Sequence, residues 1–292
     1  MTESESGNLV ALNYCVSFID LLGQRDAARG QSLLPSTASA DEANSFHETF
    51  RSNIGGILQL QKDVEEMAKG LCPDPNSPLR ESLDEGQKAI WDEIQNKSVK
   101  TQYWSDGFVR FACLGDTRIK CLMNGVNEIF ITAGYFCLLG LVRRRPVRGA
   151  IDIAWGVEIR PGELYGPAVI RAYELESEVA QYPRIVVGQA VIPFLEAHRM
   201  NSGNDPIVRV SQAWAQRCLD MLTQDDDGNW IIHYLGDAFQ TAVTNNHHGF
   251  LYGKARDFVV QQVLEHKKVR NSKLAFRYSQ LLAYFDAHAP SA

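Results

Sequence analysis

Two aspartates in this chain stand in short glycine-flanked turns beside apolar runs. Asp20 follows the run 11–19, which is rich in Val, Tyr, Phe and Ile, and Gly23 comes shortly after it. Asp106 lies in the turn Ser105-Asp106-Gly107 between two further runs. Mg²⁺ and Mn²⁺ bind hard oxygen ligands, and two such ions held together bridge phosphate oxygens and activate an attacking hydroxyl. Each aspartate alone is an ordinary turn residue, but together they predict two-metal phosphoryl chemistry.

The elements that would position these aspartates alternate between strands and helices. Apolar runs and turn residues predict strands over 11–19, 99–104, 108–113, 147–159 and 185–187. Helical spacing predicts helices over 41–69, 87–95, 119–141 and 166–179, and a proline-rich surface loop over 71–86. We therefore expect an α/β (α+β) sandwich, with helices covering one face of a mixed or antiparallel sheet.

The C-terminal part differs in character from the rest. We expect residues 1–190 to form a catalytic domain and residues 191–292 to form a mostly helical extension, interrupted by a hairpin turn at Asp225 to Gly228. Two helices between 249 and 288 carry apolar stripes suited to packing on the core or on a second subunit. No internal repeat is visible.

The charge balance excludes one class of partner. With 29 basic and 35 acidic residues, the formal net charge is −6, so no general positive field is available to hold a nucleic-acid polymer. The one basic run, Arg143 to Arg145 with Arg148 just beyond, is too short for such a footprint. It fits either a solvated helix end, which is the commoner role, or a site for a single phosphorylated ligand.

Cysteine usage and hydropathy indicate a cytoplasmic protein. The six cysteines form no C-x-x-C pair and mostly stand inside apolar stretches, as buried thiols do in a reducing compartment. The N-terminal residues 1–8 are polar and acidic, without the apolar core of an export signal. The most apolar stretch, 129–142, is short and contains two glycines, so we expect no membrane span.

Several motifs occur in an order that resembles the class III adenylate/guanylate cyclase family. Phe18-Ile19-Asp20-Leu21-Leu22-Gly23 is similar to its first metal motif, and Ser105 to Val109 to its second. Arg148 to Ile151, followed by Trp155-Gly156, resembles the strand before its nucleotide-recognition segment. The run Gly166 to Glu176 matches the spacing of its G-x-x-V-N-x-A-x-R-L-E helix. The resemblance covers residues 11–187.

The resemblance implies a homodimer with active sites at the interface. It implies that Asp20, Asp106 and the backbone carbonyl of Leu21 bind two divalent cations, Mn²⁺ or Mg²⁺. It also implies that the backbone N–H groups of Leu22 and Gly23 hold phosphates, as such turns commonly do.

The chain departs from the family at four positions. Ile170 and Glu174 replace the catalytic Asn and Arg, so the charge on the transferring phosphoryl group needs another cation. Arg171, one residue along, is the nearest substitute; its alternative role is a surface ion pair with Glu174 or Glu178. At the two base-recognition positions the chain has Gln102 and Glu163, which is neither the adenylate nor the guanylate set.

These departures are similar to those of the bacterial pyrimidine cyclases of Pycsar antiphage systems, which implies that UTP is converted to cyclic UMP for a separate effector. A glutamine satisfies both a carbonyl and an N–H of uracil, whereas the amino group of cytosine suits an acidic side chain such as Glu163. CTP therefore remains an alternative substrate.

Two other functional classes are open. An inactive cyclase-like domain that binds a nucleotide or only dimerises would explain Ile170 and Glu174. A metal-dependent phosphohydrolase would use the same aspartates with His233, His247 or His248 as ligands. No histidine pair has ligand spacing, which disfavours the second class.

Overall fold

The computed structural model describes residues 9–23, 39–70, 78–96, 99–104, 107–243 and 248–289. Its strands are β1 (Ala11–Leu21), β2 (Lys100–Tyr103), β3 (Gly107–Cys113), β4 (Val147–Arg160), β5 (Glu163–Tyr165), β6 (Ile185–Val187), β7 (Leu222–Gln224) and β8 (Trp230–Ile232). Its helices are α2 (Ala40–Gly70), α3 (Pro78–Glu81), α4 (Glu85–Gln95), α5 (Met123–Val142), α6 (Pro167–Glu174), the π-helical turn η1 (Leu175–Val179), α7 (Val191–Arg199), α8 (Pro206–Asp220), α9 (Asp237–Val243), α10 (His248–Lys268) and α11 (Ser272–Ala287).

The described strands form one mixed sheet, in the order β2-β3-β1-β4-β6-β8-β7, with β5 paired to β4. Only β4 and β6 run parallel within this set; the other pairs are antiparallel. The prediction of a mixed α/β fold with a helical C-terminal region is confirmed. β1 lies in the middle of the sheet and is buried over residues 14–19, because its β-branched and aromatic side chains pack on both faces.

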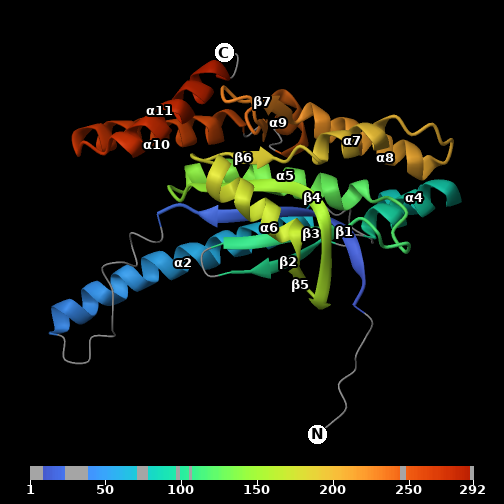
Figure 1. Ribbon diagram of the computed structural model, residues 1–292, viewed down its shortest axis with the longest axis horizontal. Coiled ribbons are helices and arrows are strands. Elements are labelled where there is room, and N and C mark those ends of the chain that lie inside the picture. The colour runs from blue at the N-terminus through green and yellow to red at the C-terminus, as the bar shows by residue number, and fades with distance from the viewer. Residues whose placement is uncertain are drawn as a thin grey trace, which may run out of the picture.

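The two faces of the sheet carry hydrophobic cores of different size, and the helices α7, α8, α10 and α11 lie together on one side of the sheet (Figure 1). The larger core lies between the sheet and the helices α5 and α7–α11, and it extends from Cys15 to Phe285. The smaller core lies on the opposite face, where Phe18 and Phe111 of the sheet meet Leu164 and Val169 of the β5–α6 segment. Helices thus cover mainly one face, while α6 packs on the other.

Helix α5 is the centre of the larger core. It is 20 residues long and apolar enough to cross a membrane by length and composition, and it begins at Met123, four residues later than predicted, and ends at Val142. However, 89% of its apolar window is buried inside the chain. An apolar surface all round the helix is what a central core helix requires, which agrees with the burial of α5 inside the fold.

Two sequence-based expectations need correction. The segment 71–86 is not a continuous loop, because α3 begins at Pro78 and α4 at Glu85. Asp84 and Gln87 form a capping box at the start of α4, which satisfies two otherwise unpaired backbone N–H groups. The C-terminal region also contributes to the sheet, since the predicted hairpin supplies β7 and β8, and β8 pairs with β6.

Candidate functional site

Asp20 lies near the C-terminal end of β1, between two neighbouring strands. In the sheet register it is opposite Gly107 of β3 on one side and Arg148 of β4 on the other. A Cβ atom on Gly107 would lie 2.6 Å from the carbonyl oxygen of Ile19 and 3.6 Å from Oδ1 of Asp20. Glycine is therefore required for this close strand approach, and it leaves the Asp20 carboxylate uncovered on that side. Asp106, the second predicted metal ligand, precedes Gly107 in the sequence and lies outside the described residues.

Arg148 is the cation next to Asp20. Its Nη2 lies 3.9 Å from Oδ2 of Asp20, and its Nε forms an ion pair with the buried carboxylate of Glu176. Glu176 belongs to η1, the π-helical turn that continues α6. Glu176 is the last residue of the segment that matches the G-x-x-V-N-x-A-x-R-L-E spacing. It positions Arg148, because a guanidinium that pairs with one buried acid through Nε keeps its other N–H groups for a ligand.

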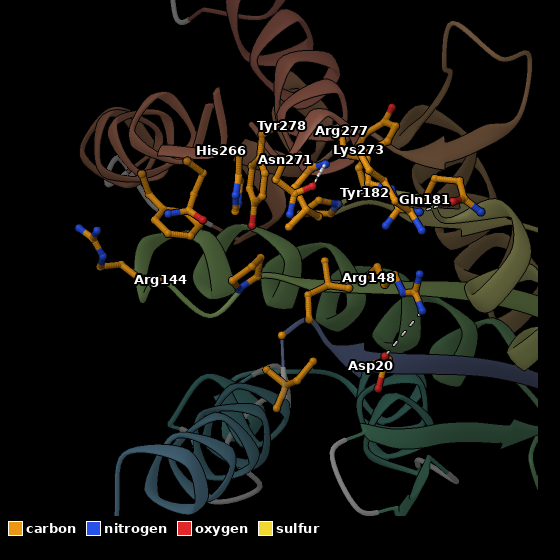
Figure 2. Close-up of a pocket in the computed structure, with 18 residues that line it drawn as sticks. Asp20, Arg144, Arg148, Gln181, Tyr182, His266, Asn271, Lys273, Arg277 and Tyr278 are labelled. Atoms are coloured by element: carbon orange, nitrogen blue, oxygen red, sulfur yellow. Dashed lines mark hydrogen bonds and ion pairs between the residues drawn. The ribbon is translucent and has the colours of Figure 1, made fainter. Parts of the chain in front are cut away.

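Asp20 and Arg148 open into a pocket of about 770 Å³. Figure 2 shows Asp20 on one wall and residues of α10, α11 and the turn between these helices on the facing wall. The facing wall includes Lys273, Arg277 and Tyr278, whose ring stacks on that of His266 with centroids 5.5 Å apart. No site residue was predicted in these helices.

In the turn after β1, the backbone N–H of Leu22 has another partner than the predicted phosphate. The backbone N–H of Leu22 donates a hydrogen bond to the carbonyl oxygen of Pro146 at 2.9 Å, so it is not available to a phosphate and that assignment is wrong. Gly23 has φ +90°, a conformation that favours glycine. Leu21, Leu22 and Gly23 nevertheless line the pocket together with Asp20.

Arg171 is not brought to Asp20 within one chain. Its Nε lies 2.8 Å from Oδ2 of Asp152, a fully buried carboxylate on β4, so its ion-pair partner is Asp152 and not Glu174 or Glu178. Asp152 is opposite Val16 in the register, about 13 Å along β1 from Asp20 at 3.3 Å per residue. Burial raises the pKa of Asp152, and the partner Arg171 opposes that rise. Arg171 compensates a buried charge that the sequence analysis had not recognised.

The two base-recognition candidates come together. The side-chain oxygen of Gln102, on β2, accepts a hydrogen bond from the backbone N–H of Leu164 at 3.1 Å. Glu163 is the neighbouring residue on β5 and pairs loosely with Arg160 at 3.8 Å. Lys100 and Glu158 form a second link between β2 and the β4–β5 hairpin, at 2.5 Å. The structure therefore holds Gln102 next to the Glu163 segment, although they are far apart in the sequence.

The residues fit part of a metal site. Asp20 offers a carboxylate at the pocket edge with no side chain on Gly107 to cover it, and hard divalent cations bind such oxygens. Within the ranges described above, which omit Asp106, no group of three or more His, Cys, Asp or Glu side chains is close enough to hold an ion. His233 contacts the Tyr284 hydroxyl at 2.9 Å, and burial, with a smaller effect of His288, lowers its pKa to about 4. His247 lies outside the described residues.

The basic run divides between two roles. Arg143 forms an ion pair with Asp63 of α2, which joins the end of α5 to that helix. Arg144 and Arg148 line the pocket. Arg110 of β3 does not supply the missing catalytic cation, because it is buried and forms an ion pair with Glu128 at 2.5 Å.

The comparisons with known proteins add no family. No protein-family model matches this chain, and the curated proteins include no match. The resemblance to class III cyclases therefore rests on the sequence motifs.

Proposed function

We propose that this protein is a pyrimidine nucleotide cyclase that converts UTP to 3′,5′-cyclic UMP and pyrophosphate, with CTP as the alternative substrate. The observation that carries the proposal is the position of Asp20. It is paired with the strand that follows Asp106, it lies 3.9 Å from Arg148, and it opens into a pocket with a basic facing wall. A carboxylate beside cations suits a metal-bound phosphate substrate.

The reaction requires one bond exchange. The 3′-oxygen bonds to the α-phosphorus, the bond from that phosphorus to the oxygen bridging to the β-phosphate breaks, pyrophosphate leaves, and the hydroxyl proton passes to solvent. Asp20 and Asp106 would hold the divalent cations, Mn²⁺ or Mg²⁺, which when bound activate the hydroxyl and neutralise charge on the pyrophosphate. Arg148, fixed by Glu176, supplies positive charge next to Asp20 in place of the arginine that Glu174 replaces.

Base recognition involves Gln102. Because its side-chain oxygen already accepts the Leu164 N–H, its amide nitrogen is the group left to donate to a pyrimidine carbonyl. Both uracil and cytosine have such a carbonyl, so this contact fits either base. Glu163, which precedes Leu164 in β5, accepts a hydrogen bond from an N–H of uracil or from the amino group of cytosine.

An exposed apolar surface supports the expected homodimer. Trp104 and Tyr173 are each about 45% exposed, and both rings contact Phe18, with centroids 5.6 and 5.4 Å away. Ile170, on the same helix as Tyr173, is 54% exposed. Large apolar side chains gathered beside a catalytic strand are typical of an interface, and a second copy of this chain is the partner that the cyclase resemblance implies.

The function is tested by incubating the protein with each of the four ribonucleoside triphosphates and Mn²⁺, and identifying products by mass. We expect cyclic UMP from the wild type. Cyclic CMP alone would select the alternative substrate, and no cyclic product from any triphosphate would refute the enzyme and favour an inactive cyclase-like domain. Such a product would act in the cytoplasm on a separate effector.

The dimer is tested separately by light scattering. We expect Ile170→Glu to give a monomer, because it places a charge on the apolar surface. Met200→Glu is the matched control, since Met200 is 69% exposed in the loop after α7. A dimeric Ile170→Glu protein, or a monomeric wild type with full activity, would contradict the interface.

A further inference from the structure

The pocket next to Asp20 has an unbalanced charge. Of the described residues that line it, Asp20 is the one acid, whereas Arg144, Arg148, Lys273 and Arg277 are cations. A pocket lined by one sign of charge attracts a ligand of the opposite sign, and low-dielectric walls strengthen that field. The single carboxylate of Asp20 cannot balance four cations. The imbalance therefore indicates that the pocket binds an anionic ligand.

The two cations of α11 have no carboxylate partner. In the part of the chain that the structure describes, no acidic oxygen lies within 4.0 Å of Lys273 or Arg277. Arg277 instead donates to the side-chain oxygen of Gln181 at 2.5 Å. Arg184 pairs with two aspartates and Arg256 with one, whereas Lys273 and Arg277 line the same pocket as Arg148 without such a partner among the described residues.

Lys273 and Arg277 line the pocket from the same helix. They are four residues apart on α11, so they lie on the same face of the helix, one turn apart. Arg277 is partly buried, and its pKa is lowered first by burial and then by the charge of Arg148. Two guanidiniums that repel each other across a pocket are stabilised when an anion lies between them.

We infer that α11 completes the phosphate site within the same chain: Lys273 and Arg277, facing Arg148 and Asp20, hold the terminal phosphates of the nucleotide and then the pyrophosphate. This assignment rests on the proposed function for the identity of the nucleotide. The charges by themselves indicate a polyanion, and the proposed function makes that polyanion the triphosphate. Helix α11 therefore adds cations to a chain that has Glu174 where the family motif has an arginine.

The test uses inorganic tripolyphosphate as the probe, titrated into the full chain in the presence of EDTA and followed by isothermal titration calorimetry. We expect the wild type to bind and the double variant Lys273→Ala/Arg277→Ala to bind at least tenfold more weakly. The matched control is Lys267→Ala/Lys268→Ala, which removes the same charge from exposed residues at the end of α10 that do not line the pocket. It should change the affinity by less than threefold.

Three results would overturn the inference: no binding to the wild type, equal binding to the pocket double variant, or an equal loss in the control. The outcome is distinguishable from failure of the proposed function. Cyclic product without pocket-dependent binding would refute this site and leave the enzyme intact. Pocket-dependent binding without cyclic product would refute the enzyme and leave a polyphosphate site.

Discussion

Asp20→Asn separates the two roles assigned to this residue. The substitution keeps the size of the side chain and removes its charge, so metal binding should weaken while the pocket keeps its shape. If Asp20 binds a catalytic cation, turnover should fall by more than about 100-fold, because metal ligation supplies several kcal/mol of transition-state stabilisation. Arg148 should stay in place, since Glu176 still holds it.

The same substitution should strengthen metal-free binding of tripolyphosphate. Asp20 lies 3.9 Å from Arg148, and at that distance two unit charges interact by about 1 kcal/mol at the dielectric constant of water. An anion bound on Arg148 feels a repulsion from Asp20 of this order. Removing it should tighten binding about fivefold in low-salt buffer, where screening is weak.

Both effects are measured on one preparation, by product mass with Mn²⁺ and by calorimetry with EDTA, after the melting temperature has shown that the variant is folded. Turnover within tenfold of the wild type would refute the role of Asp20 as a metal ligand. Weaker polyphosphate binding would show that Asp20 does not face the anion, and would refute the arrangement of charges in the pocket.

The sequence predicted the elements around Asp20 because their signals are local. Alternation, β-branched residues and glycine turns defined β1, the β2–β3 hairpin and β4, and Pro167 marked the start of α6. These patterns depend on residues that are neighbours along the chain, so tertiary contacts did not override them. The register that places Gly107 opposite Asp20 is a tertiary feature that the sequence did not predict.

The facing wall of the pocket was not predictable in the same way. Lys273 and Arg277 lie about 250 residues after Asp20, and no local pattern indicates that α11 folds over the end of β1. Their spacing of four on one helix face was the available signal, but it is equally typical of a solvated face. The partner of Arg171 was not predictable either, because Asp152 is buried within a strand where the sequence suggested no charge.

Three further predictions concern single residues. Gly107→Ala should lower stability by about 1–3 kcal/mol and reduce turnover, because its Cβ meets the carbonyl oxygen of Ile19 at 2.6 Å; unchanged melting and turnover would contradict the required close approach. Arg171→Ala should lower stability by about 1–3 kcal/mol by leaving buried Asp152 without its cation, with turnover within tenfold; a 100-fold loss in a stable variant would instead make Arg171 catalytic. The last prediction is acid sensitivity from His233, whose folded-state pKa is lowered, mainly by burial, from the usual 6.5 to about 4. The unfolded chain therefore binds the proton first, so this contribution to stability is complete above pH 6.5 and is lost as the pH falls toward 4. The loss between pH 7 and pH 5 should be about 2 kcal/mol, measured by urea unfolding. His233→Asn should lack this component, and an identical pH dependence in the variant would show that another group carries it.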